Sequence, residues 1–180
     1  MLTIYICNIL KKFNMKSIKL FFTAAVMFVS LNIIAQTANP VQPVLNAYIE
    51  LKDALVKTDG SLSAQKSKTL LGAIETVKMA DLNADVHDVW MKVLNELKED
   101  AEHISETKEV SHQRDHFMSL SKNMYAVLKK AKLEVPVYYQ FCPMANKGKG
   151  ANWLSMENKV KNPYYGNQML TCGKVVETLQ

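Results

Sequence analysis

The stretch from residue 83 to residue 104, NADVHDVWMKVLNELKEDAEHI, decides the fold class. Its apolar residues recur every three or four positions, which places them on one face of a helix: Val86, Val89, Trp90, Val93, Leu94, Leu97, Ala101 and Ile104. Asn83 stands where a helix N-cap is preferred. We expect a solvated opposite face, formed by Asp88, Lys92, Glu96, Glu99, Asp100 and Glu102. The stretch predicts one long amphipathic helix.

Three further helical patterns accompany this one. They cover residues 41–56, residues 61–80, and a segment that begins near Ser105 or Thr107 and ends near Ala131. Asp59-Gly60 is predicted to end the first pattern, because glycine readily takes the left-handed conformation that closes a helix. The connections are only a few residues long, which favours antiparallel neighbours. The predicted fold class is mainly α, an up-down four-helix bundle.

The pattern changes after Leu133, where Pro136 interrupts helical periodicity. Residues 137–141, VYYQF, are β-branched and aromatic and predict a strand. The rest of the tail is rich in glycine, proline and aromatic residues, and it is too short to bury a core of its own. We expect a helical bundle over residues 36–132 and a small irregular β-containing Cys/Met aromatic tail over residues 133–180, packed together as one domain.

Residues 1–35 are predicted to be an upstream extension and a cleaved signal peptide. An apolar run over residues 20–31 follows Lys16 and Lys19, and Ala35 is a small residue at the cleavage position. Met15 is a more natural start than Met1. The alternative is an uncleaved anchor helix, because the run is near the short limit for crossing a bilayer. We expect a periplasmic or secreted protein that has no membrane span after cleavage.

The positive charge of the chain lies in this leader. The whole chain has 22 Lys and Arg against 17 Asp and Glu. Residues 1–35 hold four lysines and no acid, so the remainder has 18 basic against 17 acidic side chains. A nearly neutral body argues against nucleic-acid binding, which needs a basic surface on the folded domain.

Four sulfur-bearing residues of the tail form a candidate metal site: Cys142, Met144, Met169 and Cys172. Residues two apart share a face in an extended segment, and residues three apart converge in a helical turn. If the two pairs meet, two thiolates and two thioethers suit Cu(I) or Ag(I), which accept soft ligands. Zinc fits less well, because its structural sites use cysteine and histidine.

A disulfide between Cys142 and Cys172 is the alternative, since two cysteines in an exported domain typically pair. Closing this loop would stabilise the fold by about 3–4 kcal/mol in the chain-entropy model. The protein would then be a structural or protein-interaction module. Its candidate docking surface consists of aromatic residues of the tail: Tyr138, Trp153, Tyr164 and Tyr165.

Four segments of the tail together resemble a known family: VYYQFCPMA at 137–145, GANWLS at 150–155, NPYYG at 162–166 and MLTCG at 169–173. They resemble exported bacterial proteins built on a domain of unknown function. They are also similar to a domain attached to periplasmic adaptor subunits of copper/silver efflux pumps. The resemblance implies an exported helical bundle with a Cys/Met tail and a link to heavy metals. If the tail binds such a metal, we expect a copper efflux adaptor or another metal carrier as partner. We interpret Trp153, Asn162, Pro163, Tyr164 and Gly166 as its structural frame.

The histidines and the other polar motifs predict no second site. His112 and His116 are four apart and share a helix face, but no third ligand is apparent, and we expect both to be solvated. His87 and His103 are expected to be exposed. The sequence shows no nucleophile–base constellation, so we expect no enzyme. The prediction is an exported accessory protein of the cell envelope that handles Cu(I) or Ag(I).

Overall fold

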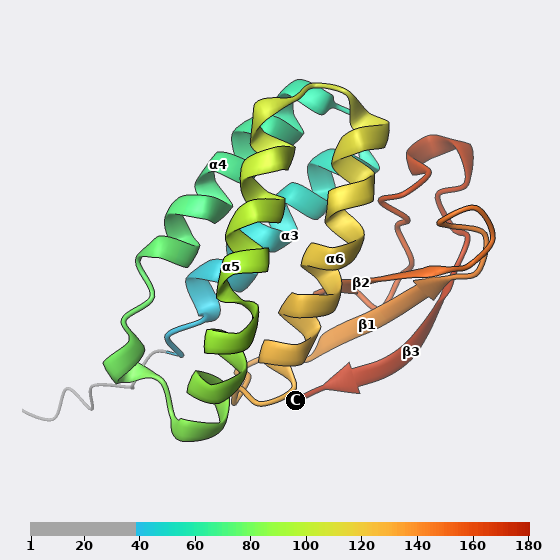
Figure 1. Ribbon diagram of the computed structural model, residues 1–180. Helices are drawn as coiled ribbons and strands as arrows, with labels where there is room; N and C mark the ends of the chain where they lie inside the picture. Colours follow the sequence, from blue (N-terminus) through green and yellow to red (C-terminus); the bar gives the residue numbers. More distant parts are fainter. Residues whose placement is uncertain (1–38) are drawn as a thin grey trace, which may run out of the picture. The chain divides into compact units, whose positions relative to one another are not determined.

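Four helices and a small sheet make up residues 39–180, the part of the chain that the computed structural model describes. The helices are α3 (Gln42–Val56), α4 (Gly60–Glu75), α5 (Ala84–Glu106) and α6 (Val110–Leu128). Successive helices pack side by side and run up, down, up and down (Figure 1). The predicted fold class is therefore confirmed. The predicted extension and signal peptide lie outside the described residues.

Side-chain caps begin three of the helices. Asn83 accepts a hydrogen bond from the Val86 amide at 3.0 Å, as its sequence position predicts. Asp59 caps α4 by accepting from the Leu62 amide at 2.9 Å. Glu109 accepts from the backbone amides of Ser111 and His112 at the start of α6. These caps fix the starts of α4, α5 and α6.

The turn between α3 and α4 differs from the prediction. The left-handed residue there is Thr58, with φ 59°, and Gly60 is the first residue of α4. Gly60 is needed for space: a Cβ at this position would lie 2.0 Å from the backbone oxygen of Lys108. The glycine therefore permits a close approach between the start of α4 and the segment that joins α5 to α6.

Helix α4 ends at Glu75, five residues before the predicted end. Thr76 is its C-cap, and its hydroxyl donates to the Ala73 carbonyl at 2.9 Å. Thr76 and Val77 are β-branched, which lowers helix propensity, and a separate 3-10 turn, η2 (Met79–Asp81), follows. Val77 nevertheless packs against the core, so its apolar character continued the helical pattern in the sequence.

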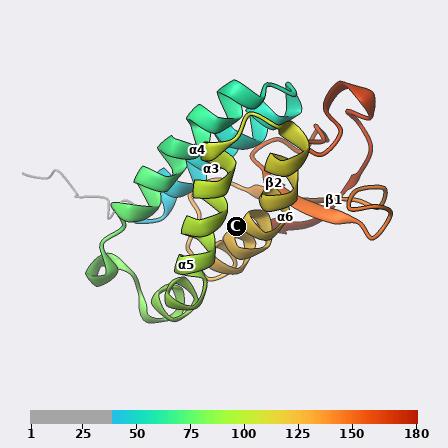
Figure 2. The ribbon, with the colours of Figure 1, turned by 45° about the horizontal axis from the view of Figure 1, so that its top comes forward.

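The tail contains a three-stranded antiparallel sheet in the order β2-β1-β3. Strand β1 (Val137–Cys142) begins where the sequence predicts, whereas β2 (Ala151–Ser155) and β3 (Lys174–Leu179) were not predicted as strands. A 3-10 turn, η3 (Gly166–Gln168), lies in the loop between β2 and β3. Both views place the sheet beside α6 (Figures 1 and 2).

Tyr48 of α3 joins the bundle to the sheet. Its buried hydroxyl lies 2.6 Å from the Ser121 hydroxyl of α6 and accepts from the Leu154 amide of β2 at 3.1 Å. The Tyr48 ring stacks on Phe117, with ring centroids 5.2 Å apart. The core is therefore shared by the helices and the tail, and the hydroxyl satisfies polar groups that burial would otherwise leave unpaired.

Arg114 of α6 ties the loop between β2 and β3 to the bundle. Its guanidinium donates to the Pro163 carbonyl at 2.8 Å, to the Leu55 carbonyl at 3.3 Å and to the Thr58 hydroxyl at 3.1 Å. A Cβ at Gly166 would lie 2.3 Å from the same Thr58 hydroxyl, so this loop lies directly against the end of α3.

None of the helices within residues 39–180 combines the length and apolar character that crossing a bilayer requires.

Candidate functional site

Cys142 and Cys172 lie together at one end of the sheet. Their Sγ atoms are 2.7 Å apart although thirty residues separate them in the chain. Cys142 is the last residue of β1, and Cys172 lies two residues before β3. Because Phe141 pairs with Lys174 in the β1–β3 register, the antiparallel pairing itself brings the two cysteines side by side. The juxtaposition is therefore a property of the strand register.

The backbone around Cys172 holds the thiol in place. The Asn162 side-chain amide donates to the Cys172 carbonyl at 2.9 Å, and the Cys172 amide donates to the Met169 carbonyl at 3.0 Å. At Gly173 φ is 139°, and a Cβ there would lie 2.8 Å from the Phe141 oxygen. A glycine is required for this close approach to β1.

The two thiols have unequal environments. Cys142 is fully buried, whereas Cys172 is partly exposed. The hydrogen bond with Cys142 is the largest cause that raises the pKa of Cys172, loss of solvent adds to it, and the Met144 backbone acts in the opposite direction. Cys172 is therefore the member of the pair that solvent reaches.

The backbones of Met144 and Met169, the two predicted thioether ligands, lie near the cysteine pair. The Met144 carbonyl accepts from the Tyr165 hydroxyl at 2.7 Å, and the Met144 backbone also contacts the Cys172 thiol. The Met144 residue is 52% exposed, and Met169 is partly buried. The structure thus brings the cysteines together, while the Met144 side chain extends toward solvent beside them.

The candidate docking surface does not hold as predicted. Trp153 is fully buried and Tyr164 is 8% exposed, so neither is part of an exposed surface. Trp153 lies opposite Gln140 in the sheet, facing the core, and its ring meets Tyr164 edge-on at 5.9 Å between centroids. Tyr138 and Tyr165 are partly exposed. The interpretation of Trp153 and Tyr164 as part of a structural frame agrees with this burial.

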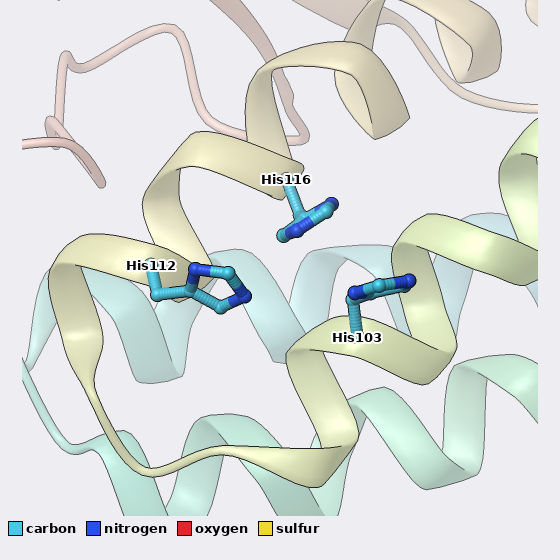
Figure 3. Close-up of side chains that lie close together, drawn as sticks. All are labelled: His103, His112 and His116. Atoms are coloured by element: carbon cyan, nitrogen blue, oxygen red, sulfur yellow. The ribbon is translucent and has the colours of Figure 1, made fainter.

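A second cluster, formed by His103, His112 and His116, was not predicted. His103 lies in the last turn of α5, and the other two lie on α6 (Figure 3). One nitrogen of each side chain lies within 4.8 Å of the others. The spacing of His112 and His116 was visible in the sequence, but the third member depends on how α5 and α6 pair.

Asp100 corrects another expectation from the sequence. It was assigned to the solvated face of α5, yet it is 7% exposed. Its carboxylate lies 3.1 Å from the Nδ1 of His116 and accepts from the Ser119 hydroxyl at 2.6 Å. Burial raises the pKa of Asp100, and these two hydrogen bonds oppose that rise. The partners come from α6, which explains why a pattern within α5 alone misplaced this residue.

Comparison with known proteins links the helical part of the chain to one family. A family model described as "Protein of unknown function (DUF3347)" matches residues 44–135, about half of the chain. The match covers the four helices except the first two residues of α3, and it ends before β1. No curated protein and no solved structure matches the chain.

Proposed function

Because the chain belongs to DUF3347, a family of proteins of unknown function, we propose its function from the site: it binds a soft monovalent ion, Cu(I) or Ag(I), through reduced Cys142 and Cys172. The observation that carries the proposal is the 2.7 Å separation of the two Sγ atoms at the end of the sheet. Two thiolates are the ligands that such ions prefer. The role is one of binding and transfer, without catalysis.

Binding requires the pair to open. With metal–sulfur bonds of about 2.3 Å, two thiolates on one ion stand about 3.5–4.6 Å apart. The partly exposed Cys172 lies in the loop that precedes β3, while Cys142 is buried at the end of the central strand. Movement on the Cys172 side therefore accommodates the ion with the least disturbance of the core.

The thioethers complete the proposed ligand set. Met144 and Met169 both have backbone contacts with Cys172. An exposed thioether such as Met144 suits an ion that is passed to a partner, because it offers a soft ligand at the surface beside the buried thiol. Met169 precedes Cys172 by three residues and would approach from the other side.

The cellular setting of the proposal rests on the sequence. The predicted signal peptide favours export to the cell envelope. The four tail segments, which lie beyond the residues matched by the family model, resemble the domain attached to copper/silver efflux adaptors. The proposed partner is such an adaptor or another metal carrier.

A second candidate function has its own support. The sulfurs are closer than a bridging ion would hold them, which favours a Cys142–Cys172 disulfide under oxidising conditions. In that form the protein is a structural or interaction module, with its tail stapled to the bundle. The two forms exclude each other at the same cysteine pair, so one set of measurements separates them.

Anaerobic titration of the reduced chain with Cu(I), against a competing chelator, tests the proposal. We expect one tightly held ion per chain, and at least a hundredfold weaker binding in Cys142→Ser and Cys172→Ser. Met144→Leu and Met169→Leu should each weaken binding about tenfold, which is about 1.4 kcal/mol. Met91→Leu is the matched control, since Met91 is 53% exposed on α5, close to the exposure of Met144.

Counting thiols in the unfolded, unreduced chain completes the test. In the chain cleaved after Ala35, which lacks Cys7, the absence of a reactive thiol indicates a Cys142–Cys172 disulfide, and two reactive thiols indicate a reduced pair. In the uncleaved chain Cys7 adds one thiol to each count. If the fully reduced chain then binds Cu(I) no better than the double cysteine variant, the metal proposal is wrong and the structural module remains.

A further inference from the structure

His103, His112 and His116 converge from two helices onto one point of the surface. One ligand nitrogen from each lies within 4.8 Å of the other two. The rings of His103 and His116 are stacked at 4.6 Å between centroids, and His112 meets His116 edge-on at 4.8 Å. Figure 3 shows the three side chains in the space between α5 and α6. The cluster is independent of the cysteine pair, because none of its members belongs to the tail.

A buried carboxylate holds one member of the cluster. Asp100 lies 3.1 Å from the Nδ1 of His116, and its second oxygen accepts from the Ser119 hydroxyl at 2.6 Å. An imidazole whose Nδ1 is fixed by a carboxylate presents Nε2 to an ion, which is the usual second shell of histidine metal sites. Asp100 therefore orients His116 as a candidate metal ligand.

The surroundings favour a cation. His103 lies in the last turn of α5, where the helix dipole is negative. Glu109 accepts from the His112 backbone amide at 2.9 Å, which places a carboxylate near this member of the cluster. His112 is exposed, and the other two histidines are half-buried, so an ion reaches the cluster from solvent.

Three imidazoles define the class of ion. Nitrogen ligands suit Zn²⁺, Cu²⁺ and Ni²⁺, whereas Mg²⁺ and Ca²⁺ prefer oxygen. A tetrahedral Zn²⁺ with bonds of about 2.0–2.1 Å holds its ligand nitrogens about 3.4 Å apart. The ligand nitrogens lie at most 4.8 Å apart, so they need to approach one another by little more than 1 Å to bind the ion. The fourth coordination position of the ion is left for water.

We infer that His103, His112 and His116 form a binding site for a divalent ion of the zinc class, with Asp100 positioning His116. The site joins the end of α5 to the start of α6. It differs from the cysteine pair in ligand chemistry and in location, so either site can exist without the other.

Titration of the full chain with Zn²⁺ against a chromophoric chelator tests the inference. We expect one ion per chain, with binding weakened at least tenfold in His112→Ala. His112 is exposed, so we expect this variant to fold as the unmodified chain does. His103→Ala and His116→Ala, made separately, should each weaken Zn²⁺ binding more than His112→Ala does. Asp100→Asn should weaken it about 10–100-fold, as loss of an orienting carboxylate does. His87→Ala, on the same helix as His103, is the matched control and should bind as the unmodified chain does.

The cysteine variants distinguish the two sites. Cys142→Ser and Cys172→Ser should keep Zn²⁺ binding, and saturating Zn²⁺ should raise the thermal midpoint of unfolding in both. Equal affinity in the unmodified chain and the three histidine variants would overturn the inference. Loss of Zn²⁺ binding in the cysteine variants alone would also overturn it, because the ion would then belong to the thiols.

Discussion

Two glycines of α4 have opposite roles at the scale of single residues, and we predict opposite effects of alanine. A Cβ at Gly60 would lie 2.0 Å from the Lys108 backbone oxygen, whereas a Cβ at Gly72 would have no neighbour within 4 Å. Gly60→Ala should therefore lower the free energy of unfolding by about 2–3 kcal/mol, since backbone must move. Gly72→Ala should raise it by about 0.5–1 kcal/mol, the ordinary helix preference.

Urea unfolding of the two variants checks this pair. Both substitutions add one methyl group to α4, but the helix preference acts in full only at the interior Gly72, because Gly60 is the first residue of the helix. Equal effects of the two alanines would show that the contact between the α4 start and the α5–α6 connection does not constrain residue 60.

Tyr48→Phe removes a single buried oxygen and should lower the free energy of unfolding by about 1–3 kcal/mol. The loss arises because the Leu154 amide and the Ser121 hydroxyl would be left buried without this partner. Equilibrium unfolding at neutral pH measures the effect. The double variant Tyr48→Phe, Ser121→Ala should lose less than the sum of the single variants, because the two groups share one hydrogen bond.

The same tyrosine predicts how stability depends on alkaline pH. Burial is the main cause that raises the pKa of both Tyr48 and Tyr164 above the ordinary value of about 10. The unfolded chain therefore loses these protons first. Stability is fully present below pH 10 and falls above it, by about 1.4 kcal/mol per pH unit for each tyrosine.

Unfolding measured between pH 9 and pH 11.5 tests this sign. In Tyr48→Phe the free energy of unfolding should fall less steeply with pH, by about 1.4 kcal/mol per pH unit, because one fewer proton is released on unfolding. The variant starts from a lower stability. A decline as steep as that of the unmodified chain would mean that Tyr48 ionises within the folded protein.

Sequence patterns predicted residues whose role is set by near neighbours. The cap at Asn83 needs only Val86, three positions along, and it was predicted correctly. The burial of Asp100 depends on His116 and Ser119 from another helix, and it was missed. Thr58 was missed for the same reason: its left-handed conformation accompanies a hydrogen bond from Arg114, 56 residues away.

At the scale of elements, register between neighbours determines both candidate sites. The β1–β3 pairing places Cys142 beside Cys172, and the α5–α6 pairing places His103 beside His112 and His116. The residue types of both sites were visible in the sequence. Periodicity gives the face of each helix but not its offset along its partner, so the convergence of the histidines required the structure.

Arg114→Lys tests how the tail is attached to the bundle. A lysine has one ammonium and cannot serve the Pro163 carbonyl, the Leu55 carbonyl and the Thr58 hydroxyl together. We expect a loss of about 1–2 kcal/mol and faster hydrogen exchange at the amides of residues 162–172. Unchanged exchange in that loop would show that Arg114 stabilises the helices alone.

At the scale of the whole molecule, the helices were more predictable than the sheet. Helical periodicity is local, so four amphipathic patterns joined by short connections were enough to predict the bundle. Strands β2 and β3 are only five and six residues long. A turn separates β2 from its partner β1, and β3 lies more than thirty residues after β1. Strand β2 also packs against α6, and strand propensity is set by such neighbours more than by local sequence.

The oxidation state of the cysteine pair should control the stability of the whole molecule. The tail contributes Leu154 and Pro163 to contacts with α3 and α6, so restraining the tail in the unfolded chain favours the complete fold. In the chain-entropy model, a cross-link between residues 142 and 172 contributes about 3–4 kcal/mol. We expect the oxidised chain to unfold at a correspondingly higher urea concentration than the reduced chain.

Cys172→Ser supplies the control for this comparison, because it removes the cross-link and leaves Cys142 buried in place. Its midpoint should match that of the reduced chain and should not respond to reductant. Adding Cu(I) to the reduced chain should recover part of the lost stability, because an ion held by both thiolates closes the same loop. If the disulfide raises the urea midpoint while Cu(I) leaves it unchanged, the two cysteines stabilise the tail only through a covalent bond.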